Sequence, residues 1–209
     1  GRVYLAREKK TEKYVAIKRI ELKNDDDIQI ASKEVSVMYD VSEQHPGFIK
    51  IHNWFLSTEP STIYSGMGDR ETWYMNIVLE YASGGDLRSR ITEHKRKKTH
   101  FKVSTVCTWL RQICSALKII HQRKLMHRDL KPSNIFLTPN DNSHLKEPNR
   151  NHSPKQRLDD LKGINVDLLD ARIGDLGLAI RTDELTRMNN RQGTEIYKSP
   201  EAHANKKYN

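Results

Sequence analysis

His127-Arg128-Asp129-Leu130-Lys131-Pro132-Ser133-Asn134 is the stretch that decides the fold of this 209-residue sequence. It holds a carboxylate, an amine and a carboxamide at Asp129, Lys131 and Asn134. These groups can accept a proton, balance negative charge and offer an oxygen to a cation. An ordinary polar turn could have the same composition, because any short motif carries a false-positive risk. The rest of the chain must therefore separate the two interpretations.

Upstream of this stretch, Val15-Ala16-Ile17-Lys18 alternates in a way that predicts a β-strand with its ammonium directed into a cleft. Glu34 follows sixteen residues later, in a segment that predicts a helix with Val35 and Met38 facing inward. Taken alone, each charged residue would be interpreted as solvated. Together with the stretch at 127–134, they predict an ion pair between Lys18 and Glu34.

Downstream, three further strings follow in order. They are Ile173-Gly174-Asp175-Leu176-Gly177-Leu178-Ala179, then Gly193-Thr194, then Ser199-Pro200-Glu201. Asp175 is a candidate charged ligand for a metal ion. Leu176 is an apolar anchor beside it.

In this order the strings resemble the motifs of eukaryotic protein kinases, and the resemblance covers almost the whole chain. Residues 127–134 match H-R-D-L-x-x-x-N, and Lys18 matches the Lys of V-A-I-K. Leu176 stands where D-F-G has Phe, and Ser199 stands where A-P-E has Ala. The resemblance implies an α+β, two-lobed protein-kinase fold, with an antiparallel sheet and one helix in the N-lobe and a truncated, mainly helical C-lobe. We expect residues 1–82 to form the N-lobe and hinge, and 83–209 a partial C-lobe with an insertion at about 139–170.

The resemblance also implies catalytic roles. Asp129 would accept the proton of the attacking hydroxyl, and Lys131 would balance charge on the γ-phosphoryl group. Lys18, held by Glu34, would reach the α- and β-phosphates of ATP. The expected ligands of Mg²⁺ are Asn134 and Asp175.

Further residues would contact ATP through the glycine-rich loop, the adenine pocket, the hinge and the ribose. A plain core would have the same apolar residue types, so only the family register makes these positions ligand contacts. The expected nucleotide-binding set is Gly1, Val3, Ala16, Lys18, Leu79, Glu80, Ala82, Asp86 and Phe136.

The resemblance extends to the activation segment. Arg128 is expected to pair with a phosphate there, and the candidate hydroxyls are Thr182, Thr186 and Thr194. We expect Thr194 to contact Asp129 and Lys131, and Thr186 to be either the regulatory phosphosite or simply an exposed loop residue. Both ends of the sequence match interior parts of the family pattern, so we expect most of a catalytic domain rather than a whole protein.

Residues Asn134–Thr138 and Ala171–Gly174 predict adjacent antiparallel strands, yet Pro139–Asp170 lies between them. Loops of this length are uncommon in compact domains. The part through Gln156 has a disordered composition, and Asp159–Leu169 has some helical spacing. A tolerated surface insertion is favoured over a docking or regulatory loop.

Residues Thr105–Gln122 predict a core helix with a buried apolar stripe at Val106, Leu110, Ile113, Leu117 and Ile120. Cys107 and Cys114 lie seven residues apart in this helix and are expected to be small buried thiols. Two such cysteines fit a reducing compartment.

The chain carries a net charge of +9. Its basic run at 94–98 lacks zinc-ligand spacing and interleaved aromatics, so a solvated helix end is favoured over direct nucleic-acid binding. It contains no apolar run long enough to span a membrane. A cytoplasmic catalytic domain is expected, and a membrane anchor elsewhere in a longer protein is compatible with this.

Lys131 within the catalytic stretch marks the Ser/Thr class of the family. Several strings resemble kinases of the α-subunit of eukaryotic initiation factor 2, among them Ala16–Ile20, His45-Pro46-Gly47 and Leu125–Phe136. The implied activity is ATP-dependent phosphorylation of that subunit, in translation regulation and a stress response, with a possible kinase homodimer. Leu176 and the short loop at 57–72 depart from that group. Wee-type cell-cycle kinases, which share Asp-Leu-Gly, and a pseudokinase scaffold remain the alternatives.

Overall fold

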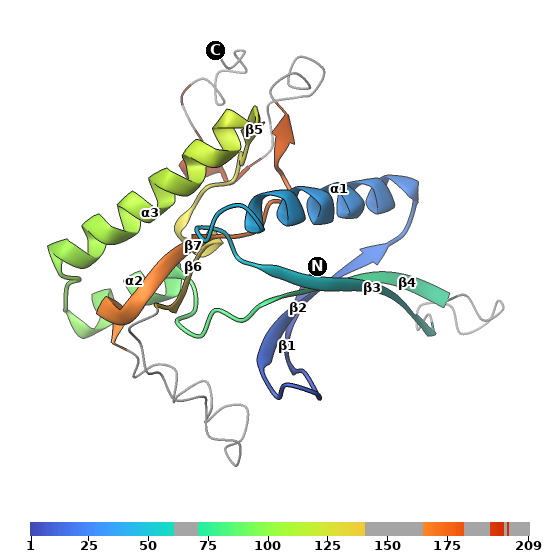
Figure 1. Ribbon diagram of the computed structural model, residues 1–209, viewed down its shortest axis with the longest axis horizontal. Helices are drawn as coiled ribbons and strands as arrows, with labels where there is room; N and C mark the ends of the chain where they lie inside the picture. Colours follow the sequence, from blue (N-terminus) through green and yellow to red (C-terminus); the bar gives the residue numbers. More distant parts are fainter. Residues whose placement is uncertain (61–70, 141–164, 182–192, 199, 201–209) are drawn as a thin grey trace. The chain divides into compact units, whose positions relative to one another are not determined.

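The computed structural model describes residues 1–60, 71–140, 165–181, 193–198 and 200 (Figure 1). Within these residues the chain divides into two units. The first comprises Gly1–Gln44 and Lys50–Tyr81, and the second comprises His45–Ile49 and the chain from Ala82 onward. Each unit has its own sheet and helix, so each is described by itself.

The first unit contains a four-stranded antiparallel sheet, as predicted for the N-lobe. Its strands are β1 (Arg2–Arg7), β2 (Tyr14–Leu22), β3 (Ile51–Pro60) and β4 (Glu71–Glu80), in the order β1-β2-β4-β3. Lys18 pairs with Ile77, so the two side chains share one face of the sheet. Ile77 is fully buried, and Lys18 bonds to the helix of the same unit. This register places the Lys18 ammonium on the helix-covered face.

Helix α1 (Asp25–Ser42) covers that face. It starts where Asn24 Oδ1 accepts the amide of Asp27, and three aspartates in its first turn suit the positive end of the helix dipole. As predicted, Val35 and Met38 face inward. The complete buried stripe is Ala31, Glu34, Val35, Met38 and Val41.

The sequence from Phe48 to Leu56 predicts one strand, and this prediction is wrong at its start. Strand β3 begins at Ile51, whereas Phe48 and Ile49 belong to the second unit. The amide of Ile49 donates to the carbonyl of Ile173 at 2.9 Å, and the amide of Ile173 donates to Gly47 at 2.8 Å. Backbone pairing with a segment far away in sequence outweighs continuation of the local strand, and no local pattern signals it.

The second unit combines two helices with short antiparallel pairs. The helices are α2 (Leu87–Lys97) and α3 (Val103–Gln122). Strand β5 (Leu125–Met126) pairs with β8 (Ile180–Arg181), and β6 (Ile135–Pro139) pairs with β7 (Leu169–Ile173). Among the described residues there are also three short 3₁₀ turns, at Pro132–Asn134, Val166–Leu168 and Glu195–Tyr197. The β6–β7 pair confirms the hairpin predicted on either side of the insertion.

Helix α3 forms where predicted, but the predicted buried stripe is largely wrong. Leu110 is 55% exposed and Val106 is also exposed, whereas Trp109 and Ala116 are buried. The buried residues of the helix are Thr105, Trp109, Ala116 and Ile120. Both stripes have helical spacing, and the buried one includes Trp109, whose Nε1 donates to the carbonyl of Leu169.

The same rotation of α3 overturns the prediction for its thiols. Cys107 and Cys114 are both exposed rather than buried. Each cysteine is two residues away from a buried residue, Cys107 from Thr105 and Cys114 from Ala116. Side chains two residues apart point to nearly opposite sides of an α-helix, so both thiols lie on the outward face.

Both ends of the insertion are fixed within the second unit. The amide of Asn140 donates to the carbonyl of Leu168 at 3.0 Å, which closes the base of the segment. Trp109 Nε1 donates to the carbonyl of Leu169 at 2.8 Å. Gln112 donates to Asp170 Oδ1 and accepts the amide of Ala171. Residues 141–164 lie outside the described residues.

None of the helices among the described residues is both long enough and apolar enough to cross a membrane.

Candidate active site

The first group of candidate residues lies in the first unit. Lys18 Nζ lies 2.6 Å from Glu34 Oε1, and Glu34 is only 4% exposed. A buried carboxylate is costly unless it is paired and hydrogen-bonded, so this contact holds the ammonium at a defined position. The predicted ion pair is therefore present.

The second group lies in two segments: the loop between β5 and β6, and the residues that follow β7. Arg128 and Asp175 both have positive φ, 61° and 58°, which is unfavourable for residues other than glycine. Two contacts hold this backbone: Arg128 Nε donates to the carbonyl of Leu178 at 2.7 Å, and His127 Nε2 lies 3.1 Å from the carbonyl of Gly174. The loop is thereby tied to the segment that carries Asp175.

Asp129 is the centre of the polar network in this loop. Its Oδ2 lies 2.7 Å from Lys131 Nζ and accepts Asn134 Nδ2 at 3.1 Å. Its Oδ1 accepts both the amide and the hydroxyl of Thr194, at 2.9 and 2.6 Å. Lys131 Nζ also donates to Thr194 Oγ1 at 2.6 Å. The expected contact of Thr194 with both residues is present.

These partners determine the charge of Asp129. Burial alone would raise the pKa of its carboxyl group, but the bonds from Lys131 and Thr194 outweigh burial and lower the pKa below its ordinary value. Asp129 is therefore a carboxylate at neutral pH. Several donors hold its two oxygens, so the orientation of the carboxylate is fixed.

His127 supports this loop as a neutral ring. Burial lowers its pKa, although the bond to the Gly174 carbonyl and the nearby aspartates act in the opposite direction. The amide of Asp129 donates to Nδ1 at 3.3 Å, so the other nitrogen, Nε2, carries the hydrogen that Gly174 accepts. The sequence prediction included the motif but gave His127 no role.

The chemistry of the expected metal ligands suits Mg²⁺. Asn134 Nδ2 donates to the backbone and side-chain oxygens of Asp129, so its Oδ1 is the atom that can ligate a cation. The amide of Gly174 donates to the carbonyl of Asn134 at 3.0 Å, which brings the residue before Asp175 beside the other ligand. Oxygen donors of this kind, with one carboxylate, fit the preference of Mg²⁺. Leu176, 2% exposed, packs as the apolar anchor.

The expected nucleotide contacts fall into both units. In the first, Val3 pairs with Lys18 and Ala16 pairs with Leu79, so these four share one face of the sheet. A Cβ at Gly1 would lie 2.9 Å from the carbonyl oxygen of Arg19. The other contact of this unit, Glu80, accepts the amide of Lys50 through its side chain.

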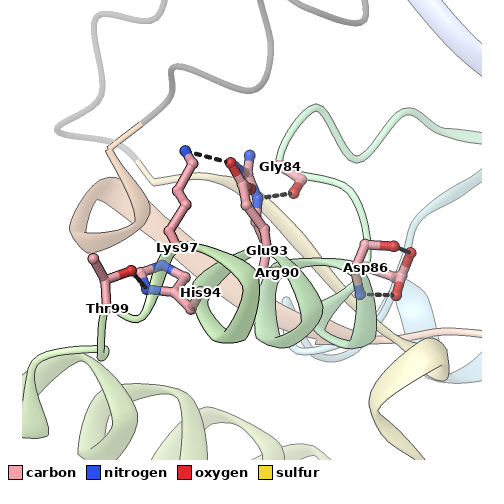
Figure 2. A network of polar contacts seen from close by, with 8 residues as sticks. Gly84, Asp86, Arg90, Glu93, His94, Lys97 and Thr99 are labelled. Carbon is pink, nitrogen blue, oxygen red and sulfur yellow. Dashed lines mark hydrogen bonds and ion pairs between the residues drawn. The ribbon is translucent and has the colours of Figure 1, made fainter.

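In the second unit, Asp86 and Phe136 form an isolated bridge. The carboxylate of Asp86 caps α2, accepting the amide of Ser89 at 2.8 Å and its hydroxyl at 2.6 Å (Figure 2). Ala82 accepts the amide of Gly85 at 3.0 Å. The cap is an additional function of Asp86 that the sequence prediction missed.

The predicted activation segment is only partly described. Thr182 and Thr186 lie outside the described residues, as do Ser199 and Glu201. Near the end of the segment, the hydroxyl of Tyr197 accepts Arg88 Nη1 at 3.4 Å. Thr194 is thus the candidate hydroxyl whose contacts are known.

A protein kinase domain model matches residues 1–209, so the chain belongs to the protein kinase family. Among its relatives, the human serine/threonine-protein kinase Nek5 is 30% identical over the full chain, which spans 24% of that protein. Mouse serine/threonine-protein kinase Nek1 is also 30% identical over the full chain, which spans 14% of it. Rat myosin light chain kinase 3 is 28% identical over 76% of the chain and 18% of that relative. The chain therefore spans a quarter or less of each of these relatives.

Proposed function

We propose that the protein carrying this chain is a serine/threonine protein kinase that transfers the γ-phosphoryl group of ATP to a protein hydroxyl. The observation that carries the proposal is the group of contacts around Asp129. A carboxylate with a lowered pKa lies against an ammonium and a threonine hydroxyl, at the family's catalytic position.

In the proposed reaction, the substrate hydroxyl oxygen attacks the γ-phosphorus while the bond to the β-phosphate oxygen breaks, leaving ADP. The hydroxyl proton passes to Asp129. Lys131 balances the negative charge on the transferred group, and Lys18, fixed by Glu34, positions the α- and β-phosphates. When bound by Asn134 and Asp175, Mg²⁺ would neutralise phosphate charge.

Two observations support a serine or threonine acceptor. Lys131 stands two residues after Asp129 and donates to Thr194, which itself donates to Asp129. The Nek relatives also carry the words serine/threonine-protein kinase in their names.

The finer substrate assignment remains a proposal. The names of the relatives described above, which are Nek kinases and a myosin light chain kinase, give no support to a kinase of initiation factor 2. The α-subunit of that factor, with the associated stress response and homodimer, therefore stands as one candidate in a substrate panel. Cytosolic placement stays a prediction, with the free thiols of Cys107 and Cys114 compatible with it.

The alternative of a pseudokinase scaffold is disfavoured by the chemistry of the described residues. The five polar positions that phosphoryl transfer requires are all occupied by the required types: Lys18, Glu34, Asp129, Asn134 and Asp175.

The test is Asp129→Asn in the full protein, measured as phosphoryl transfer to a protein substrate panel and as MgATP binding by calorimetry. We expect turnover to fall by about 10²–10⁴ while ATP affinity changes little, because general-base positioning acts on the hydroxyl rather than on the nucleotide. Thr194→Ala should also lower turnover strongly. Turnover of Asp129→Asn within threefold of wild type would remove Asp129 from the mechanism.

A further inference from the structure

Helix α2 carries an arginine that is almost completely buried. Arg90 is 6% exposed, whereas arginine is rarely buried unless it is paired. Its Nε donates to the carbonyl of Gly84 at 2.8 Å, and its Nη1 lies 3.3 Å from Glu93 Oε2 (Figure 2). The hydrogen bond to Gly84 is thus charge-assisted and shielded from water, which strengthens it.

The segment held by Arg90 has little freedom of its own. Gly84 donates to the carbonyl of Leu137 at 2.9 Å, and Leu137 donates to the carbonyl of Gly85 at 2.8 Å. A Cβ at Gly84 would lie 2.6 Å from the Leu137 carbonyl oxygen, closer than real contacts allow. Only glycine fits there. The chain from Ala82 to Asp86 therefore lies directly against β6, whose Phe136 is an expected adenine contact.

A second ion pair orients the guanidinium. Glu93 bonds to Arg90 through Oε2 and to Lys97 through Oε1, the latter at 2.8 Å, one turn further along α2 (Figure 2). Lys97 lowers the pKa of the Glu93 carboxyl group against a smaller effect of burial, and Arg90 adds to that lowering. Glu93 thus stays charged and keeps the rigid fork of Arg90 directed at Gly84.

We infer that Arg90 is a positioning residue for nucleotide binding, holding the Ala82–Asp86 segment against β6. The inference rests on the proposed ATP-dependent activity. Arg90 itself touches neither the nucleotide nor the acceptor in this scheme. It acts through the backbone of Gly84, so its loss should loosen the surroundings of adenine and ribose and leave Asp129 and Thr194 undisturbed.

The test compares Arg90→Met, Arg90→Lys and Glu93→Gln in the full protein, with Arg96→Met as the control. Arg96 is exposed on the same helix. Calorimetry measures the Kd for ADP, steady-state kinetics separate KM for ATP from kcat and from KM for the protein substrate, and thermal unfolding monitors folding.

We expect Arg90→Met to raise the Kd for ADP and the KM for ATP by about tenfold or more, because a hydrogen bond to a charged group is typically worth that much. The kcat and the KM for the protein substrate should change much less. Arg90→Lys, which keeps one donor but loses the fork, should be intermediate. Glu93→Gln should raise the Kd for ADP by a smaller factor. If Arg90→Met fails to fold, the Kd of Glu93→Gln tests the inference in its place.

A purely structural role would lower the unfolding temperature while leaving nucleotide affinity within twofold of Arg96→Met, and that result would overturn the inference. If wild type itself binds no ADP or ATP, the proposed kinase function fails instead, so the two failures are distinguishable.

Discussion

At the scale of single residues, three charged side chains that are buried or nearly buried each have a partner of opposite charge. Glu34 has Lys18, Asp129 has Lys131 and Thr194, and Arg90 has Glu93. Removing one partner of such a pair leaves an uncompensated charge, whereas removing both can be nearly neutral for stability. Comparing single and double variants therefore distinguishes a loss of stability, which the double variant should recover, from a loss of catalysis, which it should not.

The Lys18–Glu34 pair provides the first such test. Lys18→Met alone should destabilise the protein by about 2 kcal/mol or more, because it leaves the Glu34 carboxylate buried without its ammonium. The double variant Lys18→Met/Glu34→Met should recover much of that stability. Both should remain catalytically impaired, because each lacks the proposed contact of Lys18 with the phosphates of ATP. Urea unfolding and kinase assays on the same samples provide the comparison.

A double variant as unstable as the single one would show that Glu34 is held by other groups. Wild-type activity in either variant would remove Lys18 from the mechanism.

His127 gives a second prediction, on pH. Because burial lowers its folded-state pKa, the unfolded chain takes up a proton near pH 6.5 that the folded ring resists. Its contribution to the unfolding free energy is constant above about pH 6.5 and falls as the pH drops below that value. Urea unfolding between pH 5 and 8 should therefore show a decline on the acid side that is shallower in His127→Gln.

The control is His100→Gln, at an exposed position before α3, which should keep the wild-type slope. Equal slopes for His127→Gln and wild type would mean that His127 titrates alike in the folded and unfolded chains.

At the scale of elements, the insertion is best understood through its anchors. Asp167 accepts the hydroxyl of Thr105 and lies 2.6 Å from Lys102 Nζ. Leu169 is 2% exposed and accepts Trp109. The C-terminal anchor is therefore part of the second unit's packing, although the sequence places it inside a long polar segment.

We accordingly expect two deletions to differ. Replacing 141–164 with a short flexible linker should leave the unfolding free energy within about 1 kcal/mol of wild type, because loop-closure entropy changes slowly with length. Deleting 140–169 should destabilise by several kcal/mol, since it removes a buried leucine and the contacts on α3. Chemical unfolding of both proteins is the measurement. Equal stabilities would show that the anchors on α3 contribute little.

At the scale of the whole chain, ordered motifs predict the family and the polar types at the site, because phosphoryl transfer restricts those types and their order. The sequence does not predict which face of α3 is buried, since both stripes have helical spacing. The hydrogen-bond partner of Trp109 is the carbonyl of Leu169, which is sixty residues away in the sequence. The pairing of Ile49 with Ile173 is hidden for the same reason. The sequence also does not predict the burial of Arg90. In a helix with many basic residues, a buried arginine and a solvated one look the same in the sequence, and only the structure shows the bond to Gly84.

The outward orientation of Cys107 and Cys114 has a practical consequence. Seven residues of α-helix separate their Cα atoms by about 10 Å, beyond the reach of a disulfide within one chain. These two thiols therefore cannot form a disulfide with each other while α3 is folded. Maleimide or iodoacetamide can modify both in the native protein, and their labelling rates would act as a footprint of whatever covers the outer face of α3.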